Sequence, residues 1–581
     1  MGPRLERSDR PKTQKADTVA GAYLALLANR GVDYLFGNAG TDFAPLIEAY
    51  SQAAQTGVAV PRPILATHEN LAVSMAHGYG MVSRRIPAVM VHVSVGTANM
   101  VCAAMNAARE NVAILLTAGR SPLTETGLLG SRDGYIHWAQ EMYDQAGMIR
   151  EIVKWDYELR NGEQLTTVVD RALAIAATEP RGPVYLSLPR EVIAAPLPDR
   201  EQLSPSRFAA ASPAAPDAGA IAAAAEMLAQ AKRPLIVTSN VGRDAAAFAA
   251  LAKFAERFAI PVVQHRPRYL SLPSSHPMNL GFNPAQQVQK ADTVLVIECD
   301  VPWIPSQVAP AEHCKVIQCG LDPLFERYPI RGFPCDIAIT GSALATLSAL
   351  VPALEQKSTA ESIVLRRRWI ADERASLTAA YKTALDAAAR RTPPDPVWVS
   401  HCIGRTKDPR CIVINEYTLF PEHCTFESPD LYFGSSSASG LGWGPGAALG
   451  AKLARPESPV MAVVGDGAYM FSNPAAVHHA AALHDLPVLF VVMNNAMWGA
   501  VQRSTLAMYP DGMASRSNEA NFVQLGKLPA FERICEAAGG YGERVDDPAV
   551  LPEALERAMA VVKNERRQAL LNVICGPGGT A

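Results

Sequence analysis

Short apolar runs alternate with longer, helix-like segments along most of the chain. Runs such as 32–37 (VDYLFG), 86–94 (IPAVMVHVS) and 291–300 (ADTVLVIECD) end in small or polar residues. Strands that are buried on both faces of a parallel sheet have this nearly continuous apolar composition. The alternation therefore predicts α/β layers built on parallel sheets. Ligands of such sheets bind beyond the carboxyl ends of the strands, so the polar residues that follow these runs are the first candidates for function.

Two stretches interrupt the alternation. Residues 191–216 are rich in Ala, Pro and Ser, and residues 353–397 join a charged, helix-like piece to RRTPPDP. Both are typical of linkers. The first 17 residues are polar and of mixed charge, and they lack the apolar centre of a signal peptide. We predict a flexible tail (1–17) and three doubly wound domains, which are 18–190, a central Rossmann-like domain at 217–352, and 398–581.

Composition narrows the function classes. The 581 residues are 49% hydrophobic and 19% charged, which is ordinary for a globular enzyme. A formal charge of −3 gives no broad electrostatic reason to bind nucleic acid or anionic membrane, and no apolar run is long enough to span a membrane. The ten cysteines form no CxxC pair and several lie in strand-like runs, so we expect buried free thiols and a reducing, cytoplasmic compartment.

The strongest motif joins two strand-like runs near the C-terminus. Gly465-Asp466-Gly467 closes the run PVMAVV, and Asn494-Asn495 closes LPVLFVVM, with 26 residues between them. The segment between begins with Asn473, a favourable N-cap residue, and Pro474 at a first helical position. This is a strand–helix–strand crossover with an acid at one strand end and paired amides at the next.

Mg²⁺ prefers an octahedron of oxygen ligands and often binds phosphate oxygens. One carboxylate, one amide carbonyl and one backbone carbonyl would leave room for two phosphate oxygens and a water. Glycines let backbone N–H groups approach a diphosphate closely, near a helix N-terminus that favours anions. The motif therefore predicts a diphosphate–metal site.

With this spacing, nearly the whole chain after the tail resembles the thiamine-diphosphate enzymes of the acetolactate synthase, pyruvate oxidase and decarboxylase group. The resemblance implies thiamine diphosphate and Mg²⁺ as cofactors, three α/β domains (pyrimidine-binding, central and diphosphate-binding), and a homodimer at minimum, with a homotetramer favoured. It places metal ligands at Asp466, Asn495 and the Met497 carbonyl. It places cofactor contacts at Thr418, Ser439, Leu441, Gly465, Gly467, Ala468, Asn495 and Met497, with Leu441 as the wedge that bends the cofactor.

The activating acid of this family resembles Glu69. It follows His68 at the start of a helical pattern in ATHENLAVSMAHGYGMVSRR, which leads into the strand-like run 86–94. Taken alone, a glutamate in a first helical turn is usually a solvated residue favoured by the helix dipole. The resemblance implies instead that Glu69 hydrogen-bonds the cofactor's pyrimidine ring and relays the proton whose loss from C2 makes the ylid. In the family, this glutamate and the diphosphate site belong to different subunits.

Three further residues favour a decarboxylase. His92 ends an apolar run in VHVSVGTAN and resembles an active-site histidine of benzoylformate decarboxylase. His276 in SSHPMN resembles a second one, and Thr41 in FGNAGT occupies the place of its substrate-binding serine. Arg503 and Ser504 stand where that enzyme has apolar pocket walls. A non-aromatic substrate is therefore an alternative to an aromatic one. A 2-keto acid or an aldehyde is the expected class of substrate.

Two alternatives remain. One is a carboligase resembling acetolactate synthase, or a 2-hydroxyacyl lyase; the other is a non-catalytic family member, against which the intact motif and Glu69 argue. The central domain has no GxGxxG fingerprint, so FAD is not expected. The residues His478, His479 and His484 do not converge on one helix face, and we expect them at the surface.

Overall fold

The computed structural model describes residues 18–197, 206–517 and 521–576. The predicted tail at 1–17 and part of the linker at 191–216 lie outside these residues. The chain divides into two compact units, Met1–Ala211 and Ser212–Ala581. Three all-parallel sheets with helical crossovers confirm the predicted fold class.

The first unit holds a six-stranded sheet in the order β2-β1-β3-β4-β6-β5. Its strands are β1 Tyr34–Gly37, β2 Arg62–Leu65, β3 Ala88–Val91, β4 Leu115–Arg120, β5 Asp156–Glu158 and β6 Val184–Pro189. Its helices are α1 Val19–Asn29, α2 Ala44–Thr56, α3 Glu69–Ser83, α4 Val93–Arg109, α5 Ile136–Ala139, α6 Leu165–Ala177 and α7 Arg190–Ala194. Strands β1 and β3 are neighbours, so the segments that follow them meet at one edge of the sheet.

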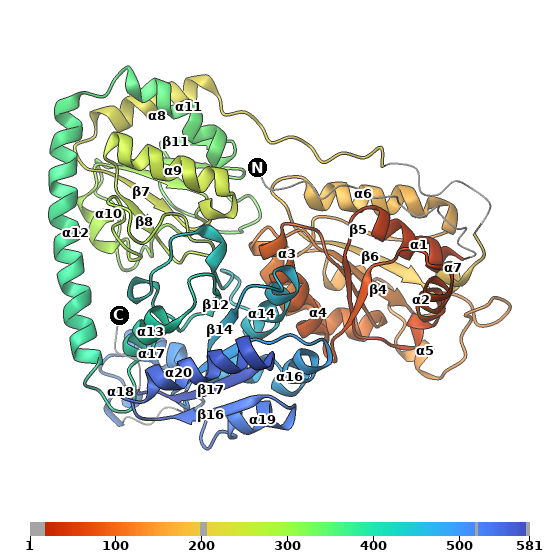
Figure 1. Cartoon of the computed structure of the whole chain (residues 1–581). Helices are drawn as coiled ribbons and strands as arrows, with labels where there is room; N and C mark the ends of the chain where they lie inside the picture. The colour runs from red at the N-terminus through yellow and green to blue at the C-terminus, as the bar shows by residue number, and fades with distance from the viewer. Residues whose placement is uncertain (1–17, 198–205, 518–520, 577–581) are drawn as a thin grey trace. The chain divides into compact units, whose positions relative to one another are not determined.

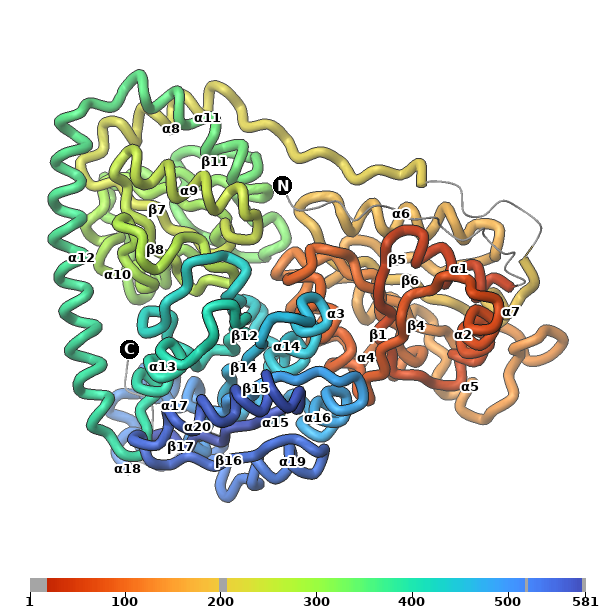
Figure 2. The backbone as a smooth tube through the Cα atoms, in the orientation of Figure 1, coloured from red at the N-terminus to blue at the C-terminus, as the bar shows by residue number. Residues whose placement is uncertain are grey.

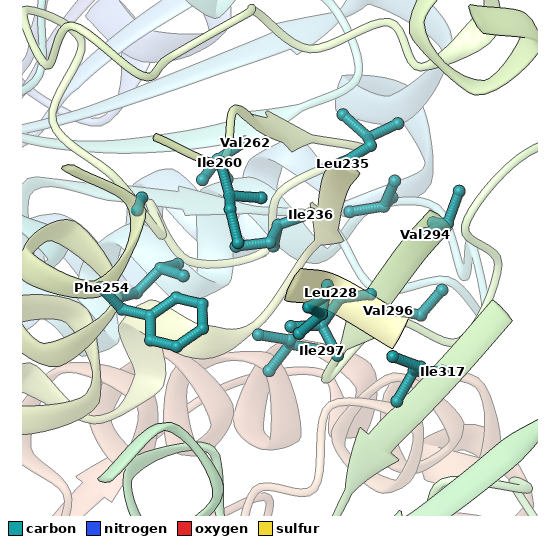
Figure 3. Packing of buried hydrophobic residues seen from close by; sticks show 14 of the residues in the cluster. Leu228, Leu235, Ile236, Phe254, Ile260, Val262, Val294, Val296, Ile297 and Ile317 are labelled. Atoms are coloured by element: carbon teal, nitrogen blue, oxygen red, sulfur yellow. The ribbon is translucent and has the colours of Figure 1, made fainter. Parts of the chain in front are cut away.

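The second unit begins with a five-stranded sheet in the order β11-β10-β9-β7-β8. The strands are β7 Pro234–Thr238, β8 Val262–Gln264, β9 Thr293–Ile297, β10 Lys315–Gly320 and β11 Ile337–Thr340. The helices are α8 Ala218–Gln230, α9 Ala245–Phe258, α10 Ala285–Lys290 and α11 Ala343–Glu355. Figure 3 shows the core between these layers, where Leu228 of α8 and Phe254 of α9 pack beside Ile236 and Ile297 of the strands. Burying a side chain of this size stabilises the fold by roughly 1.5–3 kcal/mol.

A six-stranded sheet in the order β13-β12-β14-β15-β17-β16 completes the second unit. The strands are β12 Ile412–Glu416, β13 Tyr432–Gly434, β14 Val460–Gly465, β15 Leu489–Asn494, β16 Tyr541–Val545 and β17 Ala569–Ile574. The helices are α13 Pro396–Thr406, α14 Trp443–Ala454, α15 Asp466–Phe471, α16 Pro474–Leu483, α17 Gly499–Met508, α18 Met513–Ser517, α19 Phe531–Ala537 and α20 Leu551–Ala560.

The second predicted linker contains the helix α12, Ala360–Ala388, which runs along one side of the second unit from α11 to α13 (Figure 1; Figure 2 traces the same path as a tube). Its Arg366 is buried, and the guanidinium donates to the Leu228, Ala229 and Ala231 carbonyls at the end of α8. A cation at a helix C-terminus satisfies carbonyls that have no partner within the helix. The helix is thereby fixed to the central domain.

Cys102 and Cys335 are exposed and the other eight cysteines are buried free thiols, as expected for most of them. Among the residues that the structure describes, no helix is both long and apolar enough to cross a membrane.

Candidate functional site

The carboxyl ends of three adjacent strands bring the motif residues of the second unit together. Strand β14 lies between β12 and β15, with Glu416 opposite Val464 and Gly465 opposite Met493. Thr418 follows β12, Asp466 follows β14, and Asn495 follows β15. The crossover inferred from the sequence therefore places its acid and its amide at one edge of the sheet.

Asp466 is almost fully buried, with 3% of its surface exposed. Its Oδ1 accepts the Gly467 N–H at 2.7 Å, whereas its buried Oδ2 has no hydrogen-bond partner. Burial raises the pKa of the Asp466 carboxyl, and the nearby peptide N–H groups, that of Gly467 first, oppose that rise. A buried carboxylate oxygen without a donor costs free energy, which a bound cation would remove.

The two asparagines of the motif have different surroundings. Asn494 is buried and donates from Nδ2 to Oδ1 of Asn572 on β17 at 3.0 Å. Asn495 lies half-buried beyond the strand, and its Oδ1 accepts the Met497 N–H at 3.2 Å. The Met497 carbonyl accepts the Gly499 N–H at 3.0 Å and keeps a second lone pair. Asn494 thus supports the sheet, and Asn495 is the amide available to a ligand.

The diphosphate side of this edge is formed by Thr418 and the glycines of the motif. Thr418 Oγ1 is buried without a hydrogen-bond partner, and a β-carbon built on Gly465 would lie 3.3 Å from its Cγ2. A β-carbon on Gly467 would overlap the ring of Trp498, so only glycine fits there. Ala468 is buried one residue further along α15.

These residues fit a diphosphate-bound Mg²⁺. The site offers one buried carboxylate oxygen and one buried hydroxyl that lack partners, beside an amide oxygen and a backbone carbonyl. No cluster of three or more His, Cys, Asp or Glu side chains suited to a metal ion occurs within the described ranges. A metal bound by one carboxylate and otherwise by neutral oxygens agrees with the preference of Mg²⁺ for sharing its shell with phosphate.

Glu416 organises the glycine-rich loop, 436–442, which precedes α14. Its carboxylate accepts the Gly442 N–H at 2.8 Å and the Gly444 N–H at 2.7 Å. Gly442 has φ +88°, and a β-carbon there would lie 2.6 Å from the Phe471 backbone. Within this loop Ser439 has φ +58° and shares a hydrogen bond with the Tyr417 hydroxyl. Leu441 is half-buried.

The pH dependence of stability tests this arrangement. Burial raises the pKa of Glu416 from 4.5 to about 7, and the N–H groups of Gly444, Gly442 and Trp443 oppose the rise. A raised folded-state pKa means that the native protein binds the extra proton between those two values, so the free energy of unfolding falls as pH rises through this window. Each tenfold difference in proton affinity between the folded and unfolded states corresponds to about 1.4 kcal/mol. Glu416→Gln does not titrate, so the wild type should lose thermal stability relative to it as pH rises from 4.5 to about 7. A pH-independent difference in melting temperature would contradict the assignment.

In the first unit, Glu69 is the first residue of α3, and His68 Nδ1 caps that helix by accepting the Asn70 N–H at 3.1 Å. The Glu69 carboxylate is buried and accepts from Asn38 Nδ2 at 2.9 Å and from Asn99 Nδ2 at 3.0 Å. Two amides from different elements thus hold the carboxylate in one orientation. Glu69 is therefore buried and hydrogen-bonded, unlike the solvated glutamate that is usual in a first helical turn.

His92 follows β3 directly, and its Nδ1 lies 2.6 Å from Oδ1 of Asp42. Asp42 belongs to a short 3-10 turn, Thr41–Phe43, and its Oδ2 also accepts the Val93 N–H at 3.3 Å. The hydrogen bond that His92 donates to Asp42 is the largest influence on the pKa of His92 and raises it, against burial, with the charges of Asp42 and Glu69 adding to the rise. Thr41 is exposed next to this pair.

His276 lies in the loop that leads into the short segment paired with β8. Asn279 pairs in parallel with Val262, the first residue of β8, so His276 lies at the amino end of that strand. There its Nδ1 accepts the Met278 N–H at 3.2 Å, and Arg374 of α12 donates to the neighbouring Ser275 carbonyl. A contact of His276 with the substrate stays a prediction.

Two smaller expectations need correction. Asn473 does precede α16, but it has φ 56° and makes no side-chain cap. His478 is fully buried, not at the surface, with Nε2 2.7 Å from the Tyr469 hydroxyl and Nδ1 2.7 Å from Gln568 Oε1. His479 is exposed, as expected.

Most of the chain matches models of known protein families. Three models match: the N-terminal TPP binding domain of thiamine pyrophosphate enzymes over residues 17–148, their central domain over 221–350, and their C-terminal TPP binding domain over 416–573. The chain belongs to the thiamine pyrophosphate enzyme family. This confirms the resemblance drawn from the motifs and identifies the chain as an enzyme that uses thiamine diphosphate.

Relatives of this thiamine pyrophosphate enzyme include decarboxylases. It is 28% identical to a probable 2-ketoarginine decarboxylase of Pseudomonas aeruginosa, over 94% of this chain and 91% of that one. It is 26% identical to a benzoylformate decarboxylase of the same organism, over 84% of this chain and 87% of that one. The fold matches a 4-hydroxybenzoylformate decarboxylase of Rhodococcus jostii with a TM-score of 0.76 at 21% identity, covering 96% of this chain and 99% of that one.

Proposed function

We propose that the protein decarboxylates a 2-keto acid and releases the corresponding aldehyde, with thiamine diphosphate and Mg²⁺ as cofactors. The observation that carries the decarboxylase assignment is His92, held by Asp42 at the carboxyl end of β3 within the electrostatic influence of Glu69. Both relatives from Pseudomonas aeruginosa described above are named as 2-keto acid decarboxylases, which supports the same class.

Asp466, the Asn495 side chain and the Met497 carbonyl would bind Mg²⁺. Thr418, Gly465, Gly467 and Ala468 would border the diphosphate, and Ser439 and Leu441 would contact the rings of the cofactor. When bound, the cofactor supplies an electron sink for the carbon that loses carbon dioxide. The loop that bears Ser439 and Leu441 is fixed by Glu416, so the contacts are organised before the cofactor arrives.

The remaining chemistry is proton transfer and orientation. Glu69, fixed by Asn38 and Asn99, would hold and return the proton that activates the cofactor. His92 would hold a proton beside the reacting carbon, and the exposed Thr41 hydroxyl would donate to the substrate carboxylate. The smallest active form would be a homodimer, because in this family the activating glutamate and the diphosphate site belong to different subunits. Two such dimers would form the proposed homotetramer.

The assignment is tested by a screen of 2-keto acids with aliphatic, aromatic and guanidino side chains. Carbon dioxide and organic products are identified for each acid in the presence of thiamine diphosphate and Mg²⁺. Release of the aldehyde as the main product supports the proposal. Accumulation of a ligated hydroxy-keto product with little aldehyde would favour the carboligase alternative instead.

His92→Ala should lower kcat by about a hundredfold or more, the scale expected when a positioned acid–base group is lost. Thiamine diphosphate affinity should remain, because His92 belongs to the N-terminal sheet, whereas the residues proposed to bind the diphosphate belong to the C-terminal sheet. The turnover number and the melting temperature are both measured on one preparation of the variant. A variant with normal kcat and a lowered melting temperature would show that His92 serves only the core.

A further inference from the structure

Asp42 belongs to no recognisable motif, and yet it is among the most enclosed charged groups of the first unit. Its side chain is 3% exposed, and that of His92 is 16% exposed. The carboxylate has two bonds of its own, one to His92 Nδ1 at 2.6 Å and one from the Val93 N–H at 3.3 Å. A carboxylate is buried in this way only where its partners compensate for lost hydration.

Two glycines make space for the pair. A β-carbon on Gly119 of β4 would overlap the Asp42 carboxylate, and one on Gly40 would overlap the His92 imidazole. Val93, which follows His92, has φ +28°, which is unusual for a β-branched residue. Two glycines and a strained residue thus surround Asp42 and His92. These two residues follow β1 and β3, which are neighbouring strands of the sheet. Backbone strain of this kind at the end of a strand is typical of functional positions.

The contact also determines which ring nitrogen can exchange a proton. An ionised carboxylate only accepts, so Nδ1 must carry the hydrogen and Nε2 is the nitrogen that titrates. Nε2 lies 3.4 Å from Gln140 Nε2, and Gln140 Oε1 is buried without a partner. Because the oxygen and nitrogen of an amide can exchange places by rotation, Gln140 can donate to neutral His92 or accept from its protonated form.

We propose that Asp42 is a positioning residue that fixes His92 as the Nδ1–H tautomer and directs Nε2 to give and take the proton in the reaction. The proposal rests on the decarboxylase function proposed above. The charged groups that act on His92 are the Asp42 carboxylate beside it and the Glu69 carboxylate of α3, and both favour its protonated form. Asp42 thereby extends the interval of pH over which the histidine holds a proton.

The first test uses the unaltered holoenzyme, loaded with thiamine diphosphate and Mg²⁺ and labelled with ¹⁵N and ¹³C in its histidine rings. The His92 signals are assigned by their loss in His92→Gln. We expect Nδ1 to stay protonated on both sides of the titration and the Nε2 resonance to follow pH. A neutral ring that carries its hydrogen on Nε2 would overturn the proposal, and this result does not depend on any Asp42 variant folding.

The second test is Asp42→Asn, with Asp144→Asn as a control because Asp144 is exposed in the same unit. The pKa of His92, read from its ring signals, should fall by about one unit or more when the adjacent charge is removed. The basic limb of the kcat profile should move by the same amount, and kcat should fall by about tenfold or more while KM changes less than about threefold. The control should show neither change.

An unchanged ring pKa in Asp42→Asn would overturn the role of Asp42. A lowered ring pKa with an unmoved kcat profile would overturn the use of this histidine in proton transfer. Absence of decarboxylation by the wild type with every 2-keto acid would defeat the proposed function instead. The ring titration would still decide, without any activity, whether Asp42 determines the tautomer and pKa of His92.

Discussion

Replacing Asp466 with alanine should abolish thiamine diphosphate binding. The carboxylate is the one charged protein ligand proposed for the metal, and its Oδ2 is buried without a hydrogen-bond partner in the absence of a cation. Without the carboxylate, the neutral oxygens of Asn495 and Met497 would be the remaining proposed protein ligands of Mg²⁺. Loss of groups that merely support a metal ligand already costs about ten- to a hundredfold in affinity, so loss of the ligand should cost more than about a hundredfold. Calorimetric titration of cofactor into the Mg²⁺-containing protein measures this.

Asp485→Asn is a suitable control for this experiment. Asp485 belongs to the same crossover, is exposed, and has φ 52°, a conformation that asparagine also adopts readily. The control should bind the cofactor as the wild type does. Cofactor affinity in Asp466→Ala that is equal to that of the control would place the metal site elsewhere.

Glu69→Gln should bind the cofactor but exchange its C2 hydrogen more slowly by about two to four orders of magnitude. Glutamine keeps the size of the side chain and one acceptor, and the amide of Asn38 or Asn99 can turn its oxygen toward the new NH₂ group. The fold should therefore survive, whereas a neutral amide cannot relay a proton. Acid–base assistance of this kind is worth roughly 10²- to 10⁴-fold in rate. The rate is measured by quenched hydrogen–deuterium exchange and NMR of the released cofactor.

Glu48→Gln, an exposed change on α2 of the same unit, provides the control. Its exchange rate should equal that of the wild type. If Glu69→Gln were as fast as this control, the activating carboxylate would have to be a different residue.

Much of the fold could be predicted because the apolar runs of the parallel strands are continuous and their ends are marked by chemistry. GDG and NN fall at the ends of β14 and β15, which are adjacent in the sheet. Strand adjacency itself is not written in the pattern, but a single crossover between two parallel strands gives it directly. Thr418, at the end of the neighbouring β12, is associated with the motif only through the family resemblance.

Other features depend on contacts between segments that are far apart in the sequence. Asp42 looks like a surface residue in a turn, and only the fold brings it beneath His92, 50 residues away. Glu416 acts on glycines 26 and 28 residues away, and no spacing rule connects them. The position of His276 beside β8 also depends on the fold, since a short motif does not say at which edge of a sheet it lies. The expectation for His478 is wrong because helix spacing does not reveal a buried partner such as Gln568.

Labelled carbon dioxide would show whether this chain uses thiamine diphosphate and Mg²⁺ to remove the carboxyl group of a 2-keto acid. Cofactor-free protein is incubated with 2-keto acids labelled with ¹³C in the carboxyl group, with thiamine diphosphate, with Mg²⁺, with both or with neither. The proposed decarboxylation predicts labelled carbon dioxide from at least one acid, in catalytic amounts, only when both cofactors are present. No release above background from any acid with both cofactors, or equal release without them, would contradict it.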